Sequence, residues 1–226
     1  MNRDLRRISM VCVCALGLLA ARALADDDIS LNARLLASAR AGDEAGVLGA
    51  LKQGAAPDSR SRIGDTPLLT ASKRGLTGMA RVLVEHGANV SLPNVQGVTP
   101  LMAAAFGGYQ EITAMLLARH AELNATDRVS KTAMIYAAGE GRTAVVRQLL
   151  DAGVDINARY AHGLTALMWA AGYDMSDVVQ LLLSRGANAS LQDDRGLTAR
   201  EIAEQAGAKN VAAALAGSQT AAAPAK

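Results

Sequence analysis

The chain has 226 residues, which is enough for one domain of ordinary size or for a linear array of small repeats. Half of the residues are hydrophobic but only 3% are aromatic, and this composition favours closely packed small helices over a core built around large rings. The formal net charge is only +2, whereas nucleic-acid-binding proteins are typically strongly basic.

Residues 1–25 have the pattern of a secretory signal peptide. Three arginines precede an apolar run over 10–21, and the sequence ALA at 23–25 is a small-x-small cleavage pattern. The apolar run of about twelve residues is shorter than the roughly twenty needed to cross a bilayer, so cleavage after Ala25 is favoured over an N-terminal anchor. We therefore expect a periplasmic or secreted protein. The pair Arg6-Arg7 leaves the twin-arginine route open, but its flanking residues favour the general secretory route.

Cleavage after Ala25 would change the charge and the thiol content. Residues 1–25 hold four of the 23 basic and one of the 21 acidic residues, so residues 26–226 carry a net charge of −1. Residues 1–25 also contain both cysteines, Cys12 and Cys14. The exported chain would have no thiol for a disulfide bond or for catalysis, and its stability must come from packing.

Five segments that begin with threonine recur at a spacing of 33 residues. TPLLTASKRG, TPLMAAAFGG, TAMIYAAGEG, TALMWAAGYD and TAREIAEQAG start at Thr66, Thr99, Thr132, Thr165 and Thr198. A second apolar segment follows each of the first four in the same phase: LVEHGANV, LLARHAELN, LLDAGVDIN and LLSRGANAS. A fixed period of this length predicts a solenoid of stacked repeats.

Each repeat has the signals of two short helices. The threonine suits a helix N-cap, and Pro67 and Pro100 follow it at the first helical position. The second helix ends at Gly87, Gly153 or Gly186, which suit a left-handed C-cap. A helix pair of this size cannot bury its own apolar face, so it must stack on its neighbours, and alanine allows the helices to approach closely.

These phased segments resemble the ankyrin repeat family. The resemblance implies an all-α solenoid of about six stacked helix-turn-helix units, including two capping repeats, linked by β-turn or hairpin loops. It divides the chain into the signal peptide (1–25), an N-terminal capping repeat (26–60), four ankyrin repeats within 61–192 (61–93, 94–126, 127–159 and 160–192), a C-terminal capping repeat (193–217) and a disordered tail (218–226).

The sequence departs from the family pattern at two kinds of position. The family histidine is replaced by Leu69, Met102, Ile135 and Met168, so we expect apolar packing there. His120, Ser130 and Asp174 stand where other repeats have glycine. A non-glycine residue in the left-handed conformation is strained, so we expect the turn over 118–124 to be the least regular in the stack.

No residue pattern favours catalysis, a metal or a cofactor. The sequence after residue 25 has no cysteine and no G-x-S-x-G or S-x-x-K motif. His86, His120 and His162 are separated by 34 and 42 residues, whereas zinc ligands cluster more tightly. Asp193-Asp194 lacks the ligand ladder of a calcium loop and is interpreted as a turn.

The resemblance implies that a partner contacts the loop tips and the exposed ends of the first helices. The residues predicted to bind it are Arg62, Lys73, Arg74, Val95, Val98, Phe106, Arg128, Lys131, Glu140, Tyr160, His162 and Tyr173. The basic group of Arg60, Arg62, Lys73 and Arg74 is interpreted either as a solvated surface or as a docking site for an acidic partner. Tyr136 and Trp169, at one repeat position, are interpreted either as packing residues or as ligand contacts.

These observations favour a non-enzymatic, monomeric scaffold that binds a partner protein through its concave face and loop tips. An accessory or immunity factor for a periplasmic enzyme or toxin is the alternative, followed by a small-molecule binder. Neither nucleic acid nor, after cleavage, membrane insertion is expected.

Overall fold

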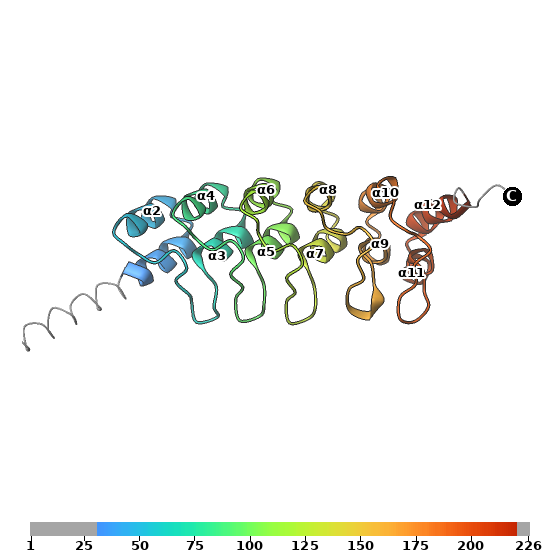
Figure 1. Ribbon diagram of the computed structural model, residues 1–226, viewed down its shortest axis with the longest axis horizontal. Helices are drawn as coiled ribbons and strands as arrows, with labels where there is room; N and C mark the ends of the chain where they lie inside the picture. Colours follow the sequence, from blue (N-terminus) through green and yellow to red (C-terminus); the bar gives the residue numbers. More distant parts are fainter. Residues whose placement is uncertain (1–30, 221–226) are drawn as a thin grey trace, which may run out of the picture.

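The helices form two parallel rows along the molecule (Figure 1). The computed structural model describes residues 31–220, so the predicted signal peptide lies outside the described residues. Within residues 31–220 the backbone is helix, turn and loop, with one isolated bridge between Gln192 and Thr198. The all-α solenoid expected from the repeat pattern is confirmed.

Six helix pairs make up the described stack. The first pair consists of residues 31–41 and α2 (Glu44–Lys52). The remaining first-row helices are α3 (Pro67–Arg74), α5 (Pro100–Gly107), α7 (Ala133–Gly139), α9 (Ala166–Gly172) and α11 (Ala199–Ala206). Their second-row partners are α4 (Thr77–Glu85), α6 (Gln110–Ala118), α8 (Thr143–Asp151), α10 (Ser176–Ser184) and α12 (Lys209–Thr220). Helix α12 extends past residue 217, where we had placed the end of the capping repeat.

A threonine caps each helix from α3 to α11 in the first row; it is buried in the first four repeats and half-buried at Thr198. Its hydroxyl oxygen accepts a hydrogen bond from the backbone N–H three residues later, at 3.1–3.4 Å. This bond satisfies one of the N–H groups that have no partner inside the helix. The predicted N-caps at Thr66, Thr99, Thr132, Thr165 and Thr198 are therefore confirmed.

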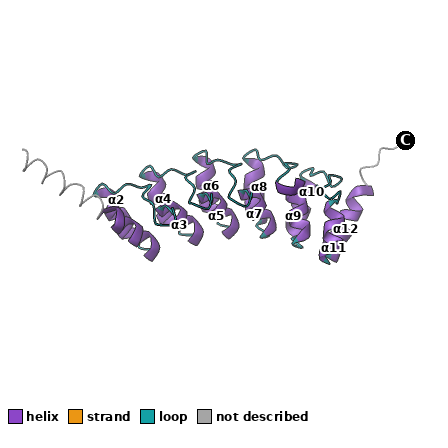
Figure 2. Cartoon of the chain, turned by 90° about the horizontal axis from the view of Figure 1, so that it is seen from below, coloured by secondary structure: helices purple, strands orange, loops and turns teal. Residues whose placement is uncertain are grey.

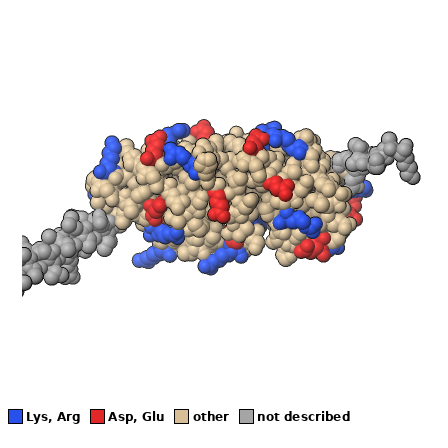
Figure 3. All heavy atoms as spheres, viewed as in Figure 1, with Lys and Arg blue, Asp and Glu red and all other residues tan. Residues whose placement is uncertain are grey.

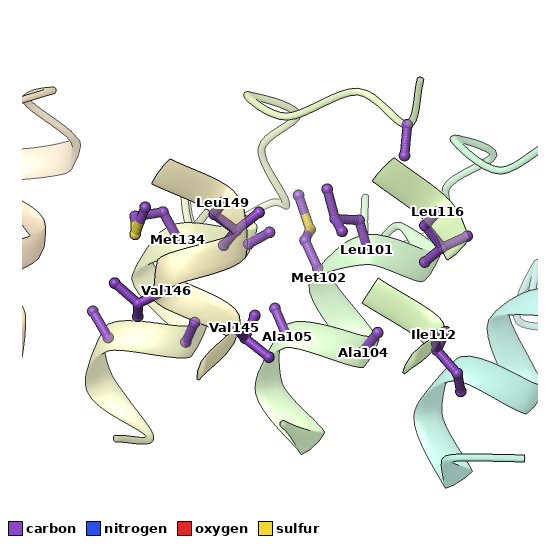
Figure 4. Packing of buried hydrophobic residues seen from close by; sticks show 14 of the residues in the cluster. Leu101, Met102, Ala104, Ala105, Ile112, Leu116, Met134, Val145, Val146 and Leu149 are labelled. Atoms are coloured by element: carbon purple, nitrogen blue, oxygen red, sulfur yellow. The ribbon is translucent and has the colours of Figure 1, made fainter. Parts of the chain in front are cut away.

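The core lies between neighbouring helix pairs (Figure 4). Each first-row helix from α3 to α9 packs against the next one, and the second row is likewise continuous from α2 to α12. One alanine per repeat, in the middle of the first helix, is fully buried: Ala71, Ala104, Ala137, Ala170 and Ala203. Figure 2 shows the resulting series of helices side by side, without a break at α6 or α8.

The positions where the family has histidine are apolar and buried, as expected. Leu69, Met102, Ile135 and Met168 are each at most 2% exposed. Met168 also accepts a hydrogen bond at its Sδ from the N–H of Thr165, at 3.4 Å. In the last repeat the corresponding residue, Glu201, is exposed, because no further repeat covers it.

The turn over 118–124 lacks a hydrogen bond that its neighbours make, so the expectation that it is the least regular one is confirmed. The N–H groups of Leu92, Ala158 and Leu191 each donate to the carbonyl oxygen three residues earlier, at 3.1–3.5 Å, whereas no such bond joins Ala125 to Glu122.

The end of the helix is nevertheless closed as in the other repeats. The N–H groups of His120 and Ala121 bond to carbonyl oxygens at the end of α6, at 3.0 Å each. Gly87 and Ala88 make the same two bonds at the end of α4. His120 does adopt the left-handed conformation, with φ 56°, as do Ser130 and Asp174. The turn therefore combines a left-handed residue at His120 with a missing hydrogen bond after it.

Replacing His120 by glycine should stabilise the protein. The left-handed conformation costs a residue with a side chain about 1–2 kcal/mol, and His120→Gly removes this cost. The larger conformational entropy of glycine in the unfolded chain offsets about 0.4–1 kcal/mol of the stabilisation. We expect His120→Gly to raise the free energy of unfolding by about 0.5–1 kcal/mol in urea titrations.

Arg119→Gly is the matched control, because Arg119 is the preceding exposed residue and has φ −102°. This variant should be less stable than the wild type. Equal losses of stability in the two variants would contradict the strain at His120.

Candidate protein-binding surface

A polar side chain at the start of the loop closes each of three tips. Asn94, Asp127 and Asp193 lie five residues before the threonine cap of the following helix. In each, Oδ1 accepts hydrogen bonds from the backbone N–H groups two and four residues later, at 2.9–3.0 Å. Side chains of this kind replace a backbone turn contact with their own oxygen. The three tips therefore hold a fixed shape without a partner.

The tip over 160–164 is built differently. Tyr160 occupies the position of the aspartate or asparagine and has no oxygen near the backbone N–H groups of its own tip. The loop instead forms the 3-10 turn η1 (Ala161–Gly163), with His162 at φ 60°. The Tyr160 hydroxyl is buried, and burial raises its pKa. The prediction that Tyr160 contacts a partner is corrected to this extent: the residue is half-buried against the core and does not present its hydroxyl group.

Backbone hydrogen bonds join most neighbouring tips. The N–H of Val95 donates to the carbonyl oxygen of Ile63 at 3.3 Å, and the N–H of Arg128 donates to that of Gln96 at 3.0 Å. The N–H of Asp194 donates to the carbonyl oxygen of His162 at 3.0 Å. Within residues 31–220, no such bond joins the tip over 127–131 to the tip over 160–164.

The carboxylates of the loops are used inside the protein. Asp65 accepts hydrogen bonds from Lys73 Nζ at 2.6 Å and from Asn94 Nδ2 at 2.8 Å. Asp127 Oδ2 accepts the Tyr136 hydroxyl proton at 2.5 Å, and Asp193 Oδ2 pairs with Arg195 at 2.7 Å. All three aspartates are buried. At the tips of Arg62 and Arg128 the aspartate of the loop is thus buried and bonded, whereas the last tip also exposes Asp194.

Basic side chains lie along the left and middle of the lower edge in Figure 3, where the tips project, and acidic side chains lie at its right-hand part. Arg62 and Arg128 are exposed, and neither side chain has an ion-pair or hydrogen-bond partner within residues 31–220. Both were predicted from the sequence to face a partner. At the tips that carry them, the field is therefore positive, although the net charge of residues 26–226 is slightly negative.

The basic group predicted around Arg62 does not form one free patch. The Arg74 guanidinium donates to the carbonyl oxygen of Arg40 at 2.5 Å and thereby caps the helix over 31–41. Arg60 donates to the carbonyl oxygen of Pro93 at 3.1 Å, and Lys73 is paired with Asp65. Arg74 and Lys73 thus have structural contacts that the sequence prediction did not include.

Four aromatic rings form a row across α5, α7 and α9. Phe106 meets Tyr136 edge to face with ring centroids 5.9 Å apart, and Trp169 stacks on Tyr173 at 5.7 Å and 7°. Lys131 joins the two pairs: its Nζ lies 5.5 Å from the Tyr136 centroid and 4.9 Å from the Trp169 centroid. We call these four rings and Lys131 the aromatic row. Burial first, and then the hydrogen bond to Asp127, raises the pKa of the Tyr136 hydroxyl, so this ring stays neutral.

Ring and glycine occupy alternate positions along the row. Gly139 lies three residues after Tyr136, and a Cβ there would be in ordinary van der Waals contact with the rings of Tyr173 and Trp169, at 3.8–4.0 Å. Gly172 likewise lies three residues after Trp169. In α5 the order is reversed, because Ala103 occupies the ring position and Phe106 lies three residues after it. The shared repeat position of Tyr136 and Trp169 is evident from the sequence, and the exchange of ring and glycine lies beside it in the same repeats. The exchange is a signal that could have predicted the row.

The first-row helices and the tips enclose a groove, which we call the concave groove. One hollow in it, of about 490 Å³, is lined by Leu36, Arg40, Ser61, Arg62, Ile63, Asp65 and Thr70. Another, of about 340 Å³, is lined by Lys73, Val98, Met102, Ala103, Phe106 and Tyr136. The second hollow lies at the Phe106 end of the aromatic row and is mostly apolar.

The remaining predicted residues lie at or near this groove. Phe106 and Tyr173 are 49% and 54% exposed, which is uncommon for aromatic side chains of this size. Val95, Glu140 and His162 are also exposed, and Val98 is half-buried in the second hollow. The structure thus gathers Val98, Phe106, Lys131 and Tyr173 along one row, and it spreads the others over separate tips and helix ends.

Residues 31–220 contain no group of three histidine, cysteine, aspartate or glutamate side chains placed to hold a metal ion. Within the same residues, no helix combines the length and the apolar character needed to cross a membrane.

The stacked helix pairs with projecting loop tips define a linear helical-repeat protein. The family model described as ankyrin repeats (3 copies) matches residues 35–127 and again 119–193, which together make up more than half of the chain. The protein therefore belongs to the ankyrin repeat family. Ankyrin repeats generally mediate protein–protein interaction, and proteins built from them are typically non-enzymatic scaffolds. No curated protein matches the chain in sequence.

Acid should destabilise the C-terminal end of the stack. Burial pushes the pKa of Asp193 up, but hydrogen bonds from Leu197 and Arg195 outweigh burial and lower it. Hydrogen bonds from Thr198 lower the pKa of Glu201. A lowered pKa in the folded state gives stability that is complete above the ordinary values of 3.8 and 4.5 and is lost as the pH falls through the lowered values.

We expect Asp193→Asn/Glu201→Gln to be less stable than the wild type at pH 7 and to lose less stability between pH 7 and pH 3. Urea titrations at both pH values measure this difference. The control is Glu111→Gln/Asp177→Asn, since both residues are exposed without ion pairs in the described stack. The same pH dependence in both double variants would contradict the assignment to Asp193 and Glu201.

Proposed function

We propose that this protein is an exported, non-enzymatic scaffold that binds one partner protein in the concave groove and at the loop tips. The aromatic row carries the proposal, because Phe106 and Tyr173 expose about half of their surface at its two ends. Large aromatic side chains of this kind dominate the binding energy of protein interfaces. Single exposed aromatic residues need no explanation, but a row of four rings across three repeats is a contiguous surface.

The construction of the groove also supports binding by a preformed surface. Oxygen atoms of Asn94, Asp127 and Asp193 fix the shape of three tips, and the core between repeats fixes the first-row helices. A surface that is already ordered loses little conformational entropy when a partner binds. The scaffold therefore needs no rearrangement of its own to present the row.

Export to a bacterial periplasm is part of the proposal and rests on residues 1–25. Their arginines, apolar run and small-x-small pattern are those of a cleavable signal peptide. The absence of cysteine from residues 26–226 suits an oxidising compartment, since no thiol would be exposed to oxidation there. A partner would then be a periplasmic protein. If that partner proves to be an enzyme or a toxin, the protein acts as its accessory or immunity factor.

Negative charge placed at both ends of the aromatic row should abolish partner binding. We expect Phe106→Glu/Tyr173→Glu to lose a specific crosslinked partner in the native periplasm, as measured by mass spectrometry, and to bind the purified partner at least about tenfold more weakly. Both positions are exposed, so the variant should fold.

Ala114→Glu/Gln180→Glu is the matched control, because it adds the same charge at exposed positions of α6 and α10 in the second row. The control should keep the partner. A partner retained by the first variant, or lost from both, would place binding outside the concave groove.

Export should remove residues 1–25. In a Gram-negative host that expresses the full chain with a C-terminal tag, we expect periplasmic protein whose intact mass corresponds to a chain starting at Asp26. Ala25→Lys should block cleavage and keep the precursor with the membrane fraction. Arg6→Lys/Arg7→Lys should still be exported if the general secretory route is used. Full-length wild-type protein in the cytoplasm would refute export.

A further inference from the structure

Lys131 lies in the middle of the aromatic row without a carboxylate partner. Its Nζ lies 4.9–5.5 Å from the centroids of two rings, and no aspartate or glutamate of residues 31–220 forms an ion pair with it. The nearest acid in its own loop is Asp127, whose Oδ1 accepts two backbone N–H groups and whose Oδ2 accepts the Tyr136 hydroxyl. The half-buried ammonium group is therefore balanced only by the faces of Tyr136 and Trp169.

The contrast with Lys73 shows that this arrangement is specific to Lys131. Lys73 also lines the concave groove, but it bonds Asp65 at 2.6 Å. Ring faces attract a cation without neutralising its charge. The two rings thus hold the Lys131 ammonium group in one place, with its full charge available to a carboxylate from another molecule.

Apolar surfaces flank Lys131 on both sides. On one side is the hollow of about 340 Å³, which Val98 and Phe106 line with partly exposed side chains over the buried Met102. On the other side is the stacked pair of Trp169 and Tyr173. A ligand that fills both sides must therefore carry an apolar group before and after its carboxylate.

The charges around the row set the side on which an acidic ligand would lie. Arg62 and Arg128 are exposed and unpaired at the tips, while Glu140 is exposed at the end of α7. Electrostatic complementarity steers an acidic chain toward the tips and away from Glu140. The basic tips and Lys131 then face the same chain.

We propose that the concave groove binds an extended acidic segment of a partner protein, with one aspartate or glutamate carboxylate on Lys131 and an apolar side chain on each side of it. The inference rests on the proposed function and gives the chemistry of the partner.

The test selects ligands without assuming a partner. A displayed library of random dodecapeptides is selected on the purified protein and, in parallel, on Phe106→Glu/Tyr173→Glu. The selected peptides are synthesised, and their affinities are measured by titration of the fluorescence of Trp169, which is the one tryptophan in the sequence. Because Trp169 belongs to the row, the signal reports binding at this site.

Peptides that bind the wild type alone should carry aspartate or glutamate between two apolar residues. Lys131→Gln should weaken their binding about tenfold, since a hydrogen bond to a charged group is lost. Lys131→Arg should retain most of the affinity. Lys52→Gln, which removes the same charge from the exposed end of α2, should have no effect. Changing the acidic residue of the peptide to its amide should lower the affinity as much as Lys131→Gln does. The two changes together should lower the affinity no further than either one alone.

The other outcomes separate the two proposals. Peptides that need Phe106 and Tyr173 but show no preference for acids would leave the proposed function standing and refute the role of Lys131. A library that yields no peptide distinguishing the wild type from Phe106→Glu/Tyr173→Glu would refute both. If Lys131→Gln does not fold, as judged by circular dichroism, the amide-substituted peptides and Lys131→Arg still decide the question.

Discussion

Close packing between neighbouring repeats is the constraint on which this structure depends. The fully buried alanines Ala71, Ala104, Ala137, Ala170 and Ala203 stand once in each of the last five helix pairs and bring each first-row helix from α3 onward against the next. A larger side chain in this column would push two repeats apart, and overpacking of this kind costs about 1–3 kcal/mol. The spacing of the loop tips follows from the spacing of the helices. The alanine column therefore sets the width of the concave groove as well as the stability of the stack.

Polar groups in the loops follow a second constraint, which is that buried oxygens and N–H groups need partners. Asp127 and Asp193 meet it by accepting hydrogen bonds from backbone N–H groups of their own loops, and Asp65 meets it by accepting one from the Asn94 side chain of the next loop. The aspartates that would balance Arg62 and Arg128 are consequently inside the molecule. A nearly neutral chain thus presents a positive edge, and the groove combines that edge with four aromatic rings.

The fold could be predicted from the sequence because its rules are local. A threonine caps the helix that follows it, and glycine or His120 ends the second helix within a few residues, so the period shows the stack directly. The site could be predicted only in part. Phe106 and Tyr173 are exposed, as their repeat positions indicate. The contacts of Arg74 with Arg40, and of Lys131 with Trp169, join residues 34 and 38 positions apart, and the repeat pattern holds no information on which side chains meet across repeats.

The boundary between the tips over 127–131 and 160–164 differs from those with a backbone link. Elsewhere an N–H of one tip bonds a carbonyl oxygen of another, and nearly any residue can supply these groups. At this boundary the described contact is Lys131 against Trp169, which depends on two particular side chains. A single codon change can remove it without altering the helices on either side. The boundary beside the aromatic row is therefore the place where a substitution can separate two loop tips while the packed helices below them stay in contact.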